Sequence, residues 1–305
     1  MNNASLSIDS ASTQNLTRFP PGSVKELGVV VYPLILSFFS MSLMSFFNRF
    51  FLSHYSVEAL EASVSAMNLA FLFQIPCMRI TSIAQIFVAR FAGSQEVGKI
   101  GSVVWQMIWL SFLSLFLTLP LGLGIGSLFF QGTVIEKTGF SYFSCLMFAN
   151  FLFPLTGALG AFFVGQGKTK IITIALAIVH ILQICLDKIL IFGIPTILLP
   201  QGAFGAATST VIAQGLYCSI LFCLFLYKKQ QSIYGTGQWQ LQPKLLKECL
   251  YLGTPRAISK LLILAAWAGS VAILIHKGGD YLLAFSLGTS FYTFFSCLNE
   301  GLGQG

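Results

Sequence analysis

The chain has 305 residues, of which 55% are hydrophobic and only 9% are charged. Soluble domains carry about 25% charged residues, so the composition excludes a soluble globule and favours a protein whose solvent is lipid. The net charge of +7 does not indicate nucleic-acid binding, because the basic residues lie in short loops between apolar runs. The seven cysteines form no CxxC pair, which favours packing thiols over metal or disulfide roles.

Eight apolar runs are long enough to cross a bilayer, at about 20 residues per crossing. The sequence therefore predicts an all-α polytopic membrane protein with about eight transmembrane helices, preceded by a polar tail at 1–24 that lacks the apolar core of a cleavable signal. The longest runs imply tilt or kinks, and prolines are the expected kink sites. The runs are 27–52, 61–89, 101–130, 138–165, 170–193, 203–227, 248–275 and 281–303, and their prolines are Pro33, Pro76, Pro120, Pro154 and Pro255.

Basic residues in the loops predict the orientation of the chain. Ten lie on one side of the predicted membrane and only two on the other. Because lysine and arginine accumulate in cytoplasmic loops, we expect a multi-pass protein of the cell (inner or plasma) membrane with a cytoplasmic N-terminus. The ten are Arg18, Lys25, Arg90, Lys99, Lys168, Lys170, Lys228, Lys229, Lys244 and Lys247, and the two are Lys137 and Lys277.

The long polar segment 228–247 predicts a cytoplasmic linker between two parts of the chain. The first part, 25–227, is expected to form an N-terminal lobe of six helices. The second part, 248–305, is expected to be the start of a second lobe.

A weak internal repeat supports this division. At an offset of 222 residues, Pro33 falls on Pro255 and His54 falls on His276. Because six helices is an even number, the second copy enters the membrane in the same direction as the first. Two full copies need about 2 × 222 = 444 residues, so the second copy is expected to lack four helices. A fragment, a truncated gene or a partner subunit would each explain that.

Two other motifs carry little chemistry. The stretch 165–169, GQGKT, lacks the glycine of a phosphate-binding loop because position 162 is Phe, and it follows an apolar helix. It predicts a tight turn and no nucleotide site. Of the three histidines only His180 lies mid-span, with no Cys/His cluster around it, so a metal site is not expected. We expect His180 to be a hydrogen-bonding residue of helix packing, with a proton relay as the alternative.

Ionisable residues inside the apolar runs are the strongest functional signal, because burying a charge in hydrocarbon is costly. Those near the ends of runs can extend their side chains to the interface. They are Arg49, Arg79, Asp187, Lys188, Arg256, Lys260 and Glu300.

Asp187 is the most informative of these residues. It lies about 17 residues into the fifth run, roughly 25 Å from the inner face at 1.5 Å per residue. Asn48 lies at similar depth in the first run, and Gln183 lies one helical turn from Asp187 on the same face. Together they predict a polar pocket for a cation or a proton. The alternative is that Asp187 only neutralises Arg49 or Lys188. His180, Lys260 and Thr210 are further candidates for a cleft or relay.

Four stretches resemble the MATE (multidrug and toxic compound extrusion) family of transporters. The similarity as a whole runs from about residue 27 to the end of the chain. They resemble the first helix with its loop, the end of the second helix, the fourth-to-fifth helix segment, whose LDKILIFG is the most specific piece, and the start of the sixth helix. The stretches are PLILSFFSMSLMSFFNRFFLSHYSVEAL (33–60), SIAQIFVARFAGSQEVGKIGSVVWQ (82–106), GALGAFFVGQGKTKIITIALAIVHILQICLDKILIFG (157–193) and GAFGAATSTVIAQ (202–214).

The resemblance implies twelve helices in two six-helix lobes, of which this chain would be a C-terminally truncated version. It also implies antiport, in which an inward Na⁺ or H⁺ gradient drives export of organic, often cationic, compounds. The expected partners are thus a small-molecule substrate and the bilayer, with Na⁺ or H⁺ as coupling ion, no other cofactor, no nucleotide and no nucleic acid.

Three residues depart from the family pattern. Asn48 and Gln183 stand where the family commonly has Asp and Asn, whereas its aspartate is kept as Asp187. Some members carry a glutamate on the seventh helix, but here KLLILAAW (260–267) begins with Lys260 and contains no acid. One carboxylate instead of two favours H⁺ over Na⁺, or a lost coupling function.

Three alternatives to an exporter remain open at this point. The first is a flippase of lipid-linked substrates from the same superfamily. The second is a membrane-embedded enzyme, which is not favoured because no clustered His, Asp and Glu or Ser and His pairs occur at one depth. The third is a truncated remnant or interaction subunit that does not transport.

Overall fold

The computed structural model describes residues 24–194 and 199–277, together with 288, 292 and 296. Every regular element in these residues is helical. In chain order they are α1 (Val24–Tyr55), α2 (Val57–Thr81), α3 (Ala84–Gly93), the 3-10 helix η1 (Val97–Lys99), α4 (Ile100–Phe130), α5 (Glu136–Phe148), α6 (Leu152–Val164), α7 (Thr169–Phe192), α8 (Gly202–Phe225), α9 (Lys228–Tyr234) and α10 (Pro243–Lys277).

Six spans among the described residues are long and apolar enough to cross a membrane, or seven if the bent pair α5 and α6 counts as one span. The prediction of an all-α polytopic membrane protein is confirmed. The eighth predicted run, 281–303, lies outside the described residues except for 288, 292 and 296.

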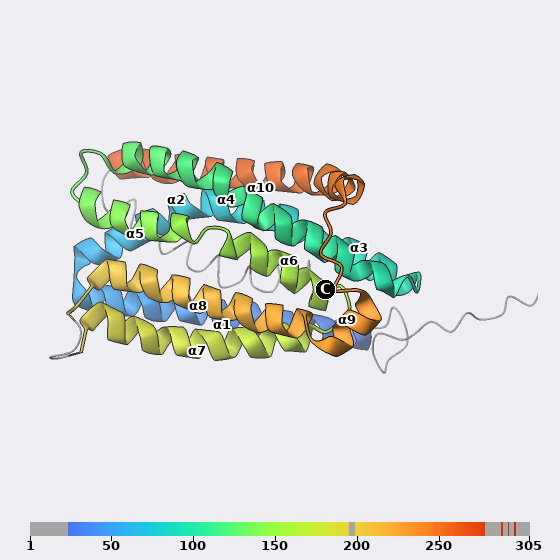
Figure 1. The fold of residues 1–305 in the computed structure, drawn as a ribbon. Helices are drawn as coiled ribbons and strands as arrows, with labels where there is room; N and C mark the ends of the chain where they lie inside the picture. The colour runs from blue at the N-terminus through green and yellow to red at the C-terminus, as the bar shows by residue number, and fades with distance from the viewer. Residues whose placement is uncertain (1–23, 195–198, 278–287, 289–291, 293–295, 297–305) are drawn as a thin grey trace, which may run out of the picture.

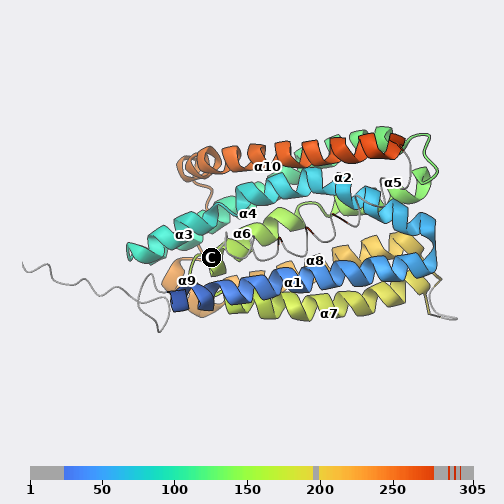
Figure 2. The ribbon, with the colours of Figure 1, turned by 180° about the vertical axis from the view of Figure 1, so that it is seen from behind.

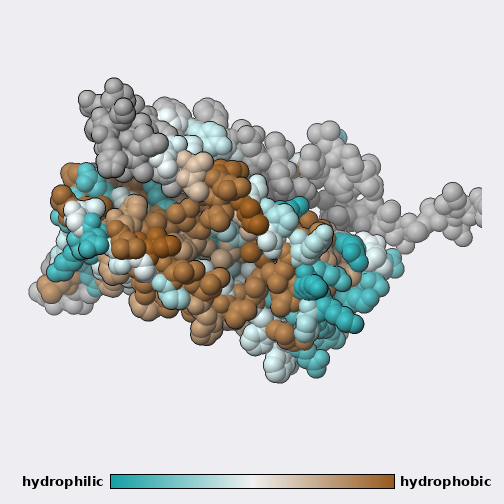
Figure 3. All heavy atoms as spheres, turned by 90° about the horizontal axis from the view of Figure 1, so that it is seen from above, coloured by the Kyte–Doolittle hydropathy of each residue, from teal (hydrophilic) through white to brown (hydrophobic). Residues whose placement is uncertain are grey.

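The helices run side by side along one long axis (Figures 1 and 2). In Figure 1, α4 and α10 lie along one edge, α1, α7 and α8 along the opposite edge, and α5 and α6 between them. Helix α2 packs against α10 as well as against α5 and α6, whereas α7 packs against α1 and α8. Apolar residues form a broad band with hydrophilic residues toward the ends (Figure 3), as expected for a surface in lipid.

The core consists of two clusters of buried apolar side chains. One lies where α3, α4, α6 and α8 meet and includes Phe162, Phe163 and Phe225. The other lies among α2, α5 and the start of α8 and includes Phe130 and Phe143. The polar residues discussed below lie beside the second cluster, since Ile191 and Ala206 of that cluster are within one turn of them in sequence.

Two of the predicted spans are interrupted. The second is broken at Ser82 and Ile83, between α2 and α3, and the fourth bends by 43° between α5 and α6. The prediction that Pro154 is a kink site of the fourth span is confirmed, because the bend lies directly before the first turn of α6, where Pro154 has no N–H for the carbonyl of Asn150. A proline is tolerated there because the first four N–H groups of a helix have no partner within the helix.

The predicted linker 228–247 is ordered in the structure. It contains α9, which the sequence did not predict, followed by residues 235–242, which we call the strap; α10 then begins at Pro243. The strap lies on the first half of α4, whose side chains satisfy its backbone groups, because backbone N–H and C=O need partners wherever they are buried. The side chains are those of Trp105, Gln106 and Trp109, which bond the backbone of Thr236, Trp239, Gln240 and Gln242 over 2.7 to 3.0 Å.

Two glycines allow the strap to approach α4 this closely. Gly235 adopts a positive φ of 65°, which a residue with a side chain rarely adopts. A Cβ atom added at Gly101 would lie 2.3 Å from the carbonyl oxygen of Gly235. The backbone of α4 and that of the strap therefore touch at a point where no side chain fits.

Candidate functional site

A single buried carboxylate lies at the junction of three helices. Asp187, in the C-terminal half of α7, is 0% exposed. One carboxylate oxygen accepts a hydrogen bond from the Asn48 amide of α1, with 3.1 Å between Nδ2 and Oδ2. The other accepts from the Ser209 hydroxyl of α8. The structure thus brings Asp187 and Asn48 together, as the depth argument predicted, and adds Ser209, which the sequence analysis missed.

A second polar pair lies one turn further along the same helices. The Gln183 amide of α7 donates to the Thr210 hydroxyl of α8, with 3.1 Å between Nε2 and Oγ1. Thr210 in turn donates to the carbonyl of Ala206 over 2.9 Å. Both side chains are buried. Gln183 therefore lies beside the carboxylate site, and its amide is directed to α8.

Tyr142 of α5 closes the site from a third side. Its ring is fully buried, and its hydroxyl has no hydrogen-bond partner that meets full geometric criteria among the described residues. Tyr142 belongs to the same buried cluster as Ile191 and Ala206, and α5 packs against α8. A buried hydroxyl without a partner is costly, so this atom is available to an incoming ligand or water. The sequence analysis missed Tyr142 because one tyrosine in an apolar run carries no distinguishing signal.

Glycine allows α7 and α8 to approach closely at this depth. A Cβ atom added at Gly205 would lie 2.4 Å from the carbonyl oxygen of Leu190. Small residues let helix backbones approach in membranes, and Gly205 lies one turn before Ser209 on α8. The short distance between these helices is what lets the short Ser209 side chain reach the carboxylate.

Further polar contacts continue along α1 and α7 toward the opposite end of the bundle. His180 accepts from or donates to Ser40, with 2.8 Å between Nδ1 and Oγ. Deeper along the pair, Ser37 and Thr173 share a hydrogen bond of 2.9 Å. His180 therefore makes the interhelical hydrogen bond expected of a packing residue. It lies two turns from Asp187, so the structure leaves the relay role as an alternative.

The candidate cations do not join the site. Arg49 and Lys188 are exposed, and no Lys or Arg nitrogen lies within 4 Å of the Asp187 carboxylate in the described part of the chain. The alternative in which Asp187 neutralises either neighbour therefore has no ion pair to support it. Lys260 lies on α10, which packs against α2 and α4 rather than against α7 and α8, so it is not part of this cluster.

The donor set suits a small hard cation or a proton. One carboxylate accepts from the Asn48 amide and the Ser209 hydroxyl, and the hydrogen-bonded pair Gln183 and Thr210 lies one turn away on the same two helices. Oxygen ligands of this kind bind alkali and other hard cations, and a carboxylate in a dry site also binds a proton. No cluster of three or more His, Cys, Asp or Glu that would hold a transition metal occurs among the residues described.

Comparison with known proteins agrees with the fold. The family model MatE matches residues 33–189, just over half of the chain, and this range contains Asn48, Tyr142, Gln183 and Asp187. No curated protein matches the chain significantly.

Solved structures of transporters match nearly the whole chain. A MOP superfamily transporter from Pyrococcus furiosus superimposes with a TM-score of 0.81 at 17% identity, over 97% of this chain and 65% of that one. A multidrug resistance MATE family transporter of the MOP superfamily in an outward-facing conformation gives 0.80 at 19% identity, over 97% and 65%. A MATE protein in complex with Br-NRF gives 0.76 at 19% identity, over 97% and 67%. At these identities the matches establish the fold, and this chain spans about two thirds of their length.

Proposed function

Since this chain belongs to the MatE family, we propose that it is a secondary active antiporter in which an inward H⁺ or Na⁺ gradient drives export of organic, often cationic, compounds. The family match points to a transporter rather than an enzyme. The MATE structure solved with Br-NRF supports a small-molecule substrate for this chain. The bilayer is the second partner that we propose for it. The excess of basic residues in one set of loops supports a cell membrane location with a cytoplasmic N-terminus.

The observation that carries the proposal is the isolation of Asp187. Its carboxylate is fully buried and its hydrogen-bond partners are the neutral side chains of Asn48 and Ser209. A buried charge without a counter-ion is costly in a membrane. The site is therefore stabilised when a proton or a cation binds and destabilised when it leaves. An H⁺ or Na⁺ ion that enters the cell down its gradient supplies that proton or cation.

Protonation changes which hydrogen bonds the site can make. An ionised carboxylate accepts at both oxygens, whereas a protonated one becomes a donor at one of them. The Asn48 amide donates to one oxygen, and it must turn or withdraw if that oxygen takes the proton. Because Asn48 is on α1 and Asp187 is on α7, loading the site changes the hydrogen bond that joins these two helices. One carboxylate, rather than two, makes H⁺ the favoured coupling ion.

Gradient-driven efflux tests the proposal. Membrane vesicles or proteoliposomes containing the protein are loaded with a cationic fluorescent dye, and efflux is followed after imposing a pH gradient or a Na⁺ gradient. We expect efflux to follow the pH gradient and to be lost in Asp187→Asn. The matched control is Glu96→Gln, which neutralises a surface carboxylate paired with Lys99. Absence of gradient-dependent efflux, or full efflux by Asp187→Asn, would refute the proposal.

A further inference from the structure

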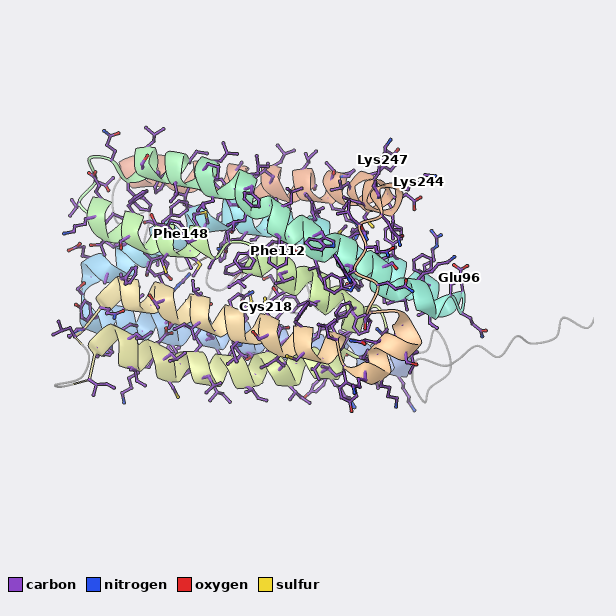
Figure 4. The ribbon with its side chains drawn as sticks, viewed as in Figure 1. Glu96, Phe112, Phe148, Cys218, Lys244 and Lys247 are labelled. Carbon is purple, nitrogen blue, oxygen red and sulfur yellow. The ribbon has the colours of Figure 1, made fainter. Side chains whose placement is uncertain are left out.

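A large open cavity lies along α5, and Asp187 does not line it. Its volume is about 1360 Å³. Residues of α5 and the start of α6 form the floor, and residues of α4 and α8 form the two walls. In Figure 4, Phe148 lies in the space between the ribbons of α4 and α8. Sites for drug-sized ligands are about 300–1,000 Å³, so this cavity, which we call the α5 groove, suits a larger occupant.

The α5 groove is polar at one end and apolar at the other. Glu136 and Lys137, both exposed, lie at its polar end in the first turn of α5. At the far end the groove closes at the break between α5 and α6. There Phe151 stacks on Phe112 with 5.5 Å between ring centroids. The carbonyl of Leu152 accepts a hydrogen bond from the Cys218 thiol of α8. Apolar and aromatic side chains line most of the length between, among them Phe140, Phe148, Phe204 and Val211.

The length of the groove matches one leaflet of a bilayer. Helix α5 has 13 residues, which span roughly 20 Å at 1.5 Å per residue. Half of a bilayer, from headgroups to midplane, is also about 20 Å. A phospholipid with its headgroup at the first turn of α5 would therefore end its acyl chain where the groove closes. Phe148, which is 61% exposed, would be covered by that chain.

The rim of the groove carries one charge of each sign. The Glu136 carboxylate is held in place by the backbone N–H of Gly132, over 2.8 Å. Lys137 follows it directly and has an exposed ammonium group. A headgroup with a phosphate and a primary ammonium complements both charges, because each forms a charge-assisted hydrogen bond. An anionic headgroup would satisfy Lys137 but place negative charge beside Glu136, and a quaternary ammonium would have no N–H to donate.

We propose that the α5 groove binds one zwitterionic phospholipid with a primary-amine headgroup, its phosphate at Lys137 and its ammonium at Glu136. An acyl chain of the lipid lies over Phe148 toward the helix break. This site is separate from the Asp187 site. Its occupancy is therefore measured by lipid binding and does not depend on whether the protein transports a substrate.

Native mass spectrometry of the purified, delipidated protein tests this site. The protein is titrated with phosphatidylethanolamine, phosphatidylcholine or phosphatidylglycerol of identical acyl chains. We expect the first phosphatidylethanolamine to bind about tenfold more tightly than the first molecule of either other lipid, the effect of one charge-assisted hydrogen bond. Glu136→Gln should remove that preference, whereas Lys137→Ala should weaken the first binding of all three lipids, because each of them has a phosphate. The glutamine of Glu136→Gln still accepts from Gly132, so only the charge is lost.

The controls separate this groove from other lipid contacts. Lys188→Ala removes an exposed lysine outside the groove and should leave the preference intact. Ser144→Phe places a ring in the groove and should block the first lipid; where this variant does not fold, the two charge variants decide. Equal binding of the three lipids, an unchanged preference in Glu136→Gln, unchanged lipid binding in Lys137→Ala, or an equal loss in Lys188→Ala would overturn the proposal.

Discussion

At the scale of single residues, the partners of Asp187 decide what the site can bind. Asn48 and Ser209 contribute hydrogen-bond donors to the carboxylate and no second negative charge. A metal cation in this site would have one carboxylate as its only negatively charged ligand. A proton needs only that carboxylate. We propose that the chemistry of these two side chains, more than the position of Asp187, sets the preference for the coupling ion.

Asn48→Asp tests that preference. It would place a second carboxylate about 3 Å from the first, and two carboxylates this close cannot both ionise unless a cation lies between them. We expect dye efflux to become more dependent on Na⁺, with the half-maximal Na⁺ concentration lowered by about tenfold. Efflux assays at fixed pH and increasing Na⁺ measure this, with Asn48→Leu as the uncharged control. An unchanged Na⁺ dependence in Asn48→Asp would show that position 48 does not determine ion choice.

The sequence predicted part of this site and not the rest, for physical reasons. Position along a span gives depth directly, because the helix rises 1.5 Å per residue, and so Asn48 and Asp187 could be paired. Position along a span does not show which helices are neighbours in the bundle. Ser209 therefore could not be distinguished from the other hydroxyl residues of its span. Lys260 could not be excluded until α10 was seen to pack on α2.

At the scale of elements, the close approach of α7 and α8 holds the site together. Gly205→Ala would place a Cβ atom 2.4 Å from the Leu190 carbonyl oxygen, and the helices must separate to make room. We expect a destabilisation of about 1–3 kcal/mol, measured as a lower midpoint of thermal unfolding in detergent. Gly215→Ala, on the same helix with its nearest neighbour 3.9 Å away, is the control and should melt like the unmodified protein. Equal melting of both variants would contradict the account.

The strap is the second element whose packing can be tested. A Cβ atom at Gly101 would overlap Gly235 and Thr236, so Gly101→Ala should lift the strap from α4. Chymotrypsin cleavage after the exposed Trp239 of the strap measures that opening, because cleavage follows the population of the open form. We expect cleavage to accelerate by about tenfold or more for each 1.4 kcal/mol lost. Gly98→Ala, which meets no atom within 4 Å, should be cleaved at the original rate; equal rates for the two variants would contradict a docked strap.

The limits of the spans followed from hydropathy, and Pro154 marked the bend in the fourth span, but the contacts at that bend could not be predicted. Long apolar runs have few alternatives in a membrane, because helices satisfy their own backbone groups. The break between α5 and α6 also has partners on neighbouring helices: the Asn150 amide bonds Thr118 of α4 over 2.8 Å, and the Leu152 carbonyl accepts from the Cys218 thiol of α8. The strap likewise depends on the side chains of α4. Such partners are distant in sequence and carry no local signal.

At the scale of the whole molecule, two contacts join the part assigned to the first lobe with the start of the second. Helix α2 packs along α10, and the strap leads from α9 into α10 while bound to α4. If the two parts rock against each other, as we propose for a transporter, α10 must slide along α2. Helix α2 also packs on α5, which carries Tyr142.

The measurement that tests the central claim most directly is the linkage between ion and substrate on the purified protein. Antiport requires that the ion and the substrate oppose each other's binding, and this effect is reciprocal. The affinity for a cationic fluorescent dye is measured by equilibrium titration at a series of pH values, with and without Na⁺. We predict that acidification weakens dye binding in the unmodified protein and that Asp187→Asn binds dye with an affinity independent of pH. If Asp187→Asn keeps the same pH dependence as the unmodified protein, Asp187 is not the coupling residue.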